Sequence, residues 1–209
     1  MDEVTTTRCG SRGLVRSQDG TRIAYERYGD GPPVILVSGA LGTARGERAL
    51  AGLLARRYSV VAYDRRGRGA SGGTGPYAVE REIADLAALV DAVGGAAGTA
   101  AVHGTACGGA LALAAAAAGV PVGPVSVYEP PFGPEDSGRL GRVHARVLVV
   151  DGGASPARAR RAARCVAAAL PRGRHRTLTG QTHEVAPHVL APVLEGFLDD
   201  CRTEQPVGA

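Results

Sequence analysis

The segment VHGTACGG, residues 102–109, decides the fold of this chain, because it joins the apolar end of a strand to the start of a helix through a tight turn. Small residues stand two positions before and two positions after Ala106. This is the spacing of a nucleophile elbow, G-x-S-x-G, in which a sharp turn lifts the central side chain above a sheet and only small neighbours avoid a clash. Alanine at the centre has no nucleophilic atom, so we expect no covalent intermediate at this position.

Strands and helices are expected to alternate on both sides of this turn. Apolar and β-branched runs predict strands at residues 33–38, 59–63, 99–102, 125–128, 143–151 and 174–178. Helical periodicity predicts helices at residues 45–57, 79–93, 108–119, 155–169 and 187–200. Asp19-Gly20 between residues 14–17 and 22–28 predicts an antiparallel hairpin at the N-terminal end. The pattern predicts an α/β fold with a doubly wound, mostly parallel sheet and helices on both faces.

The chain has the length of one domain. Its 209 residues are enough for a sizeable core and few for two. We expect a polar leader at residues 1–13, a single domain at residues 14–202 and a flexible tail at residues 203–209. Only about a dozen residues separate Glu129 from the strand expected near Val143, so we expect no cap domain over the site.

Composition excludes several classes of function. The net charge of +4 comes from arginine alone, and the absence of lysine excludes Schiff-base and lysine general-base mechanisms. With two Phe and no Trp, the chain has little aromatic surface on which bases could stack, which argues against nucleic acid as a partner. The arginine-rich stretch at residues 158–164 is expected to be the solvated face of a helix rather than a phosphate-binding patch.

The cysteines and the hydropathy pattern predict a cytoplasmic protein. Cys9, Cys107, Cys165 and Cys201 are far apart and form no C-x-x-C pair, so we expect free thiols and no metal site. No apolar run is long enough to span a bilayer, and residues 1–13 contain no apolar signal core. We therefore expect no membrane association.

Further motifs accompany the elbow segment. They are GAL at residues 39–41, YDRRGRG at 63–69, YEPPF at 128–132 and GQTH at 180–183, in the loop after the last expected strand. With these motifs the chain resembles the α/β-hydrolase superfamily, and more narrowly its small bacterial members that carry GAL, YDRRGRG and YEPPF. The resemblance covers roughly residues 18–200 and implies the α/β-hydrolase fold, without the nucleophile of an ordinary serine hydrolase.

The same resemblance implies two catalytic side chains. His183 fills the position of the catalytic histidine, and the alternative is an ordinary histidine on a surface loop. The usual position of the acid falls on Ser155, which cannot orient an imidazolium. Glu129 is the better candidate for the acid, while the alternative is a carboxylate that only braces the turn at residues 130–131.

Backbone groups complete the site that the resemblance implies. The oxyanion hole of this fold uses two backbone N–H groups, which belong here to Ala40 and Cys107, and such donors survive replacement of a side chain. A shifted thiol nucleophile at Cys107 is disfavoured, because the shift moves the exposed elbow position by one residue. The candidate residues lining the pocket are Ser38, Leu41, Thr105 and Phe132.

No cofactor is expected. Residues 67–72 match G-x-G-x-x-G formally, but the match follows no first strand of a βαβ unit and opens no helix that could face a pyrophosphate.

These residues predict a cofactor-independent enzyme of small-molecule, specialised metabolism, such as a cyclase, isomerase or lyase. His183 supplies acid–base chemistry in this hypothesis, and the Ala40 and Cys107 amides stabilise an enolate or oxyanion. Two alternatives stay open: a catalytically inactive binding or scaffold protein, and a serine hydrolase with an engineered alanine at position 106. The partner is a small-molecule substrate or ligand, and a second copy of the chain or another partner is expected to cover the uncapped pocket.

Overall fold

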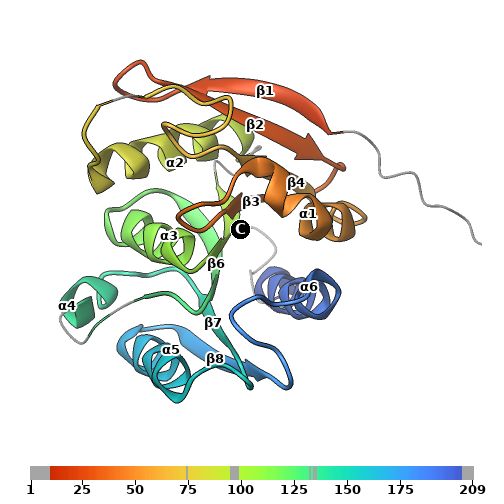
Figure 1. Ribbon diagram of the computed structural model, residues 1–209, viewed down its shortest axis with the longest axis vertical. Helices are drawn as coiled ribbons and strands as arrows, with labels where there is room; N and C mark the ends of the chain where they lie inside the picture. The colour runs from red at the N-terminus through yellow and green to blue at the C-terminus, as the bar shows by residue number, and fades with distance from the viewer. Residues whose placement is uncertain (1–9, 74, 95–98, 132, 134–135, 204–209) are drawn as a thin grey trace, which may run out of the picture.

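A single eight-stranded sheet forms the centre of the molecule (Figure 1). The computed structural model describes residues 10–73, 75–94, 99–131, 133 and 136–203. The strands are β1 (Ser11–Arg16), β2 (Arg22–Tyr28), β3 (Pro33–Val37), β4 (Ser59–Tyr63), β5 (Ala100–Thr105), β6 (Val122–Tyr128), β7 (Val147–Gly152) and β8 (Gly173–Leu178). Their order in the sheet is β1-β2-β4-β3-β5-β6-β7-β8. β1 and β2 form the expected hairpin, β2 pairs antiparallel with β4, and the other neighbours are parallel.

Helices cover both faces of the sheet. They are the 3₁₀ helix η1 (Ala44–Glu47) and the α-helices α1 (Arg48–Leu54), α2 (Val79–Val93), α3 (Cys107–Ala117), α4 (Ser137–Leu140), α5 (Ala157–Ala169) and α6 (Pro187–Thr203). α2, α3 and α5 lie on one face, and α1 and α6 lie side by side on the other (Figure 1). This two-sided arrangement is the doubly wound α/β fold, with a mostly parallel sheet, that the sequence predicts.

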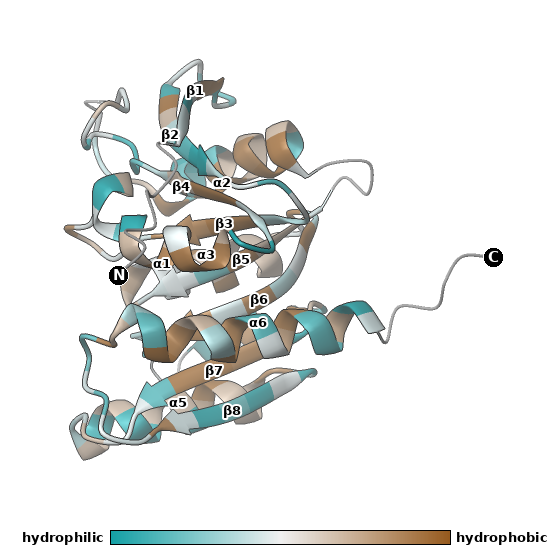
Figure 2. Ribbon diagram, turned by 90° about the vertical axis from the view of Figure 1, so that its right-hand side faces the viewer, coloured by the Kyte–Doolittle hydropathy of each residue, from teal (hydrophilic) through white to brown (hydrophobic). Residues whose placement is uncertain are grey.

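The core consists of two apolar layers, one on each face of the sheet. Alternate residues of β7 show the division: Val147 and Val149 pack towards α2, α3 and α5, and Leu148 and Val150 pack towards α1 and α6. The central strands β3 and β4 are buried on both faces, which explains their continuous apolar sequences. The edge strand β8 is largely hydrophilic (Figure 2), and its charged side chains discourage pairing with a further strand.

Several element boundaries differ from the sequence-based expectation. The helix expected at 45–57 is a 3₁₀ turn followed by a short α-helix that ends at Leu54. The expected strand at 143–151 begins only at Val147, and the helix expected from 155 begins at Ala157, because Pro156 is extended with ψ near 142°. β5 continues to Thr105, beyond the expected end at 102.

The regular structure extends beyond the expected domain limits at both ends, and α6 includes Thr203, the first residue of the expected tail. β1 begins at Ser11, within the segment expected to be a polar leader, and pairs along its whole length with β2. Residues 1–9 of that leader and residues 204–209 of the expected tail lie outside the described residues. No helix in the described part of the chain has the length and hydropathy needed to cross a membrane.

Candidate active site

The turn at Ala106 has the strained backbone of a nucleophile elbow. Ala106 lies between β5 and α3 with φ 49° and ψ −122°, a conformation that side-chain-bearing residues rarely adopt. Its N–H donates to the Tyr128 carbonyl at 2.9 Å, which fixes the turn against the end of β6. A Cβ on Gly108 would clash with the Val37 carbonyl, so the glycine allows α3 to pack closely against β3. The elbow geometry is therefore complete, although its central residue is alanine.

His183 and Glu129 form a hydrogen-bonded pair beside this elbow. His183 Nδ1 lies 2.8 Å from Glu129 Oε2, and the second carboxylate oxygen accepts the Gly152 N–H at 2.9 Å. The Glu129 side chain is 3% exposed, whereas that of His183 is 59% exposed. Because the ionised Glu129 can only accept a hydrogen bond, Nδ1 of the neutral imidazole carries the proton, and the free lone pair is on Nε2.

The environment of Glu129 keeps it ionised. Burial raises the pKa of this carboxyl, but the Ser155 hydroxyl, the Gly152 N–H and His183 together lower it below the usual 4.5. Ser155, at the position where the resemblance implies an acid, thus lies beside the carboxylate that takes that place. Glu129 itself has a positive φ of 45°, and its carboxylate reaches Gly152, the last residue of β7.

The loop that carries His183 is fixed by hydrogen bonds from several elements. The Tyr128 hydroxyl at the end of β6 donates to the Thr182 carbonyl. The Ala154 N–H donates to the Gln181 carbonyl at 2.9 Å, and the Gln181 side chain accepts the Ala186 N–H at 3.0 Å. These bonds hold Gln181 and Thr182, the two residues before His183, so the position of His183 is set by the scaffold.

The two expected oxyanion donors have no competing backbone acceptor. Cys107 is the first residue of α3, where an N–H has no partner within its helix. Neither its N–H nor that of Ala40 donates to the backbone of another described residue. Both residues line one open cavity of about 810 Å³ together with Ala106 and His183.

The candidate residues for the pocket lining fall into three groups. Leu41 and Thr105 line the cavity, and Leu41 is 94% exposed at its mouth. The structure corrects the expectation that Ser38 lines the pocket. This residue is 1% exposed and lies beneath the loop, where a Cβ on Gly42 would clash with it. Phe132 lies outside the described residues.

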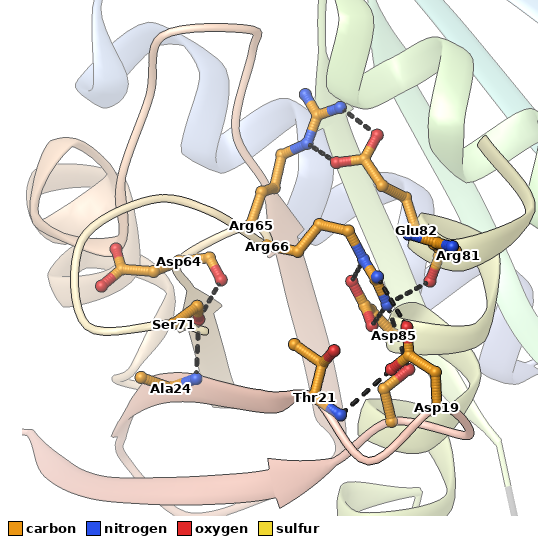
Figure 3. Close-up of polar contacts among 11 residues, drawn as sticks. Asp19, Thr21, Ala24, Asp64, Arg65, Arg66, Ser71, Arg81, Glu82 and Asp85 are labelled. Carbon is orange, nitrogen blue, oxygen red and sulfur yellow. Dashed lines mark hydrogen bonds and ion pairs between the residues drawn. The ribbon is translucent and has the colours of Figure 1, made fainter. Parts of the chain in front are cut away.

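The YDRRGRG segment has a structural role (Figure 3). Arg65 donates through Nε and Nη2 to the Glu82 carboxylate at 2.7 and 2.5 Å, and both side chains are nearly inaccessible to solvent. Arg65 Nη1 also approaches the Ser38 carbonyl at 3.4 Å. Arg66 joins Asp85 of α2 to Asp19 of the hairpin turn. The two arginines therefore tie α2 to the hairpin and to the end of β3, which carries the oxyanion loop.

Glu47, the last residue of η1, is a cavity residue that sequence reasoning missed. It lines the same cavity as Ala106 and His183. One signal was available: Glu47 stands three residues before the buried Leu50, so the two side chains share a helical face that is otherwise apolar.

A comparison with known families agrees with this geometry. Residues 34–207 match the sequence model of the alpha/beta hydrolase family. The chain belongs to the alpha/beta hydrolase family. Among proteins of this family with solved structures, an alpha/beta hydrolase from Sphaerobacter thermophilus is 37% identical with a TM-score of 0.82. That alignment covers 89% of this chain and 100% of the other.

Two other similar proteins are named as non-heme peroxidases. A non-heme haloperoxidase from Rhodococcus erythropolis is 36% identical over 83 residues, which span 39% of this chain and only 30% of that protein. The structure of BpoC from Mycobacterium tuberculosis, described as a putative non-heme bromoperoxidase, has a TM-score of 0.73 at 18% identity, covering 86% of this chain and 96% of the other. At that identity the likeness shows the shared fold alone.

Proposed function

We propose that this alpha/beta hydrolase family member is a cofactor-independent enzyme of small-molecule metabolism that transfers protons without a covalent intermediate. The observation that carries the proposal is the 2.8 Å hydrogen bond between His183 and Glu129 beside an elbow that has no hydroxyl. An ionised carboxylate that orients an imidazole serves acid–base chemistry whether or not a nucleophile is present. Cyclisation, isomerisation and elimination are reactions that need only such a base and a site for developing negative charge.

The rest of the cavity supports the same chemistry. His183 Nε2 removes a proton from a C–H bond next to a carbonyl, and the electron pair moves onto the carbonyl oxygen. The N–H groups of Ala40 and Cys107 stabilise the resulting enolate, because backbone donors fixed at a helix start and a loop need no reorganisation as charge develops. The wall of the cavity is mainly apolar, with Leu50, Val185 and Leu190 among its residues, and it suits an uncharged organic substrate.

The pairing of His183 with Glu129 favours catalysis over a binding role. The 2.8 Å hydrogen bond orients the imidazole, and the lowered pKa of Glu129 keeps the carboxyl ionised. The alternative, a binding or scaffold protein, needs the cavity but neither the paired His183 nor the ionised Glu129.

The elimination of 5-nitro-1,2-benzisoxazole tests the proposal. This reaction needs a base and a stabilised oxyanion and no nucleophile, and it reports through a coloured phenolate. We expect His183→Ala to lower kcat/KM about 100-fold or more, the usual value of a positioned general base. A wild-type rate no higher than that of the His183→Ala variant would instead support the binding protein.

A further inference from the structure

Glu47 and His183 reach the cavity from opposite sides of the elbow. Glu47 belongs to η1, which follows β3, and His183 is held by Glu129 at the end of β6. β5, which ends at the elbow, lies between β3 and β6 in the sheet. The segments that carry Glu47 and His183 therefore flank Ala106, and all three residues line the same cavity.

The Glu47 carboxyl has no polar partner. No hydrogen bond or ion pair joins it to another described residue, and its side chain shares the cavity wall with Leu50 and Leu190. An unpaired carboxyl in such surroundings resists ionisation, and burial raises its pKa above the usual value. Such a group supplies a proton at a pH where an exposed glutamate has already lost it.

Few other charges act on Glu47. Arg45 and Arg48 are on its own helical segment, and both line a separate cleft on the hairpin side, where Arg48 is ion-paired with Glu26. The loop after β8 contributes His183 and Glu184 to the cavity, and α3 contributes Cys107. Hence no cation within the cavity is paired with the Glu47 carboxyl among the described residues.

We propose that Glu47 is the general acid of this cavity and acts opposite His183 on an uncharged carbonyl compound. This inference rests on the proposed function and deepens it. His183 Nε2 takes the proton next to the carbonyl, and the electron pair moves to the oxygen held by the two amides. When the electron pair returns from the enolate oxygen, one of two reactions follows. In an isomerisation the pair forms a new C–H bond with the proton of Glu47. In an elimination it expels an oxygen leaving group, and that oxygen takes the proton of Glu47. Solvent then removes the proton from His183 and returns one to Glu47, so the protons balance.

Two related probes separate general acid catalysis from a structural effect. Elimination of 1,2-benzisoxazole breaks an N–O bond and yields a basic phenolate oxygen, which gains from a proton donor. The 5-nitro compound yields a weakly basic phenolate, which gains little. We expect Glu47→Gln to lower kcat/KM about 100-fold for the unsubstituted probe and less than about tenfold for the nitro probe. Glu80→Gln, at an exposed position of α2, is the matched control and should leave both rates unchanged.

The pH profile provides a second readout. For the unsubstituted probe, the wild type should lose activity on the alkaline side as Glu47 ionises, and Glu47→Gln should abolish this fall. Titration of the Glu47 carboxyl by ¹³C NMR in the full-length protein, assigned with the variant, should give a pKa above that of exposed glutamates. This titration does not depend on turnover.

The outcomes distinguish the two proposals. An ordinary titration of Glu47, or equal losses for both probes in Glu47→Gln, overturns the inference even when His183→Ala still abolishes activity. A wild type that does not exceed His183→Ala with either probe overturns the proposed function, and with it the inference. Thermal unfolding of each variant checks that it is folded.

Discussion

The buried ion pair between Arg65 and Glu82 predicts a large loss of stability in Arg65→Met. The two side chains are 6% and 5% exposed and share two hydrogen bonds of 2.7 and 2.5 Å. Methionine fills a similar volume but leaves the Glu82 carboxylate buried without its partner. Breaking a buried pair in this way costs about 3–5 kcal/mol. At about 2–4 °C per kcal/mol for a domain of this size, the midpoint of thermal unfolding should fall by about 6–20 °C.

Two further variants make this prediction specific. Arg174→Met makes the same substitution in an exposed ion pair, where Arg174 and Asp200 are 55% and 61% exposed, and should cost at most about 1 kcal/mol. The double variant Arg65→Met/Glu82→Leu should recover most of the loss, because an apolar pair needs no charge compensation. Urea unfolding at pH 7 measures all three. A loss below about 1 kcal/mol in Arg65→Met, or a double variant no more stable than the single one, would refute the reasoning.

Two other predictions concern the site and its mouth. Glu129→Gln should lower the free energy of unfolding by about 1–3 kcal/mol at pH 7. The folded-state pKa of Glu129 is lowered, so the stabilisation that its ionised carboxylate provides is present above about pH 4.5. This stabilisation is lost as the pH falls through the folded-state pKa. Urea titrations from pH 7 to pH 3 should show the two proteins converge, and a constant difference would contradict the assignment. Leu41 and Tyr77 are 94% and 74% exposed, and a second copy of the chain should cover the cavity mouth where Leu41 lies. Light scattering at micromolar concentration should therefore give twice the mass of the monomer. A strict monomer would argue against this partner.

The sequence predicted the limits of an element best where one hydropathy pattern continues through it without interruption. The helix expected at residues 79–93 has the same limits in the structure, because apolar residues recur along it at helical spacing. β6 was expected only from 125, since Gly123 and Pro124 resemble a turn, and the structure begins the strand at Val122. The expected end of β5 at residue 102 is likewise too early, because His103, Gly104 and Thr105 give no apolar pattern.

The motifs predicted where the site lies, but residues that carry no motif could be recognised only from the tertiary structure. His183 and Glu129 are 54 residues apart, and the family resemblance brought them into one hypothesis that the 2.8 Å contact now supports geometrically. Glu47 carries no motif, and its significance comes from its half-buried position in a cavity that three separate loops build. The partnership of Arg65 with Glu82 likewise depends on how α2 packs against the segment after β4.

Ala106→Ser tests most directly whether the site keeps all of its hydrolase machinery except the nucleophile. If His183 is oriented by Glu129 and the amides of Ala40 and Cys107 point at one spot, a hydroxyl at the elbow should be activated. We expect a fluorophosphonate adduct at position 106 in intact-mass spectra of the variant, weak hydrolysis of 4-nitrophenyl acetate, and no adduct on the wild type. A correctly folded variant that neither forms the adduct nor hydrolyses the ester would contradict at least one of the His183, Glu129 or oxyanion assignments.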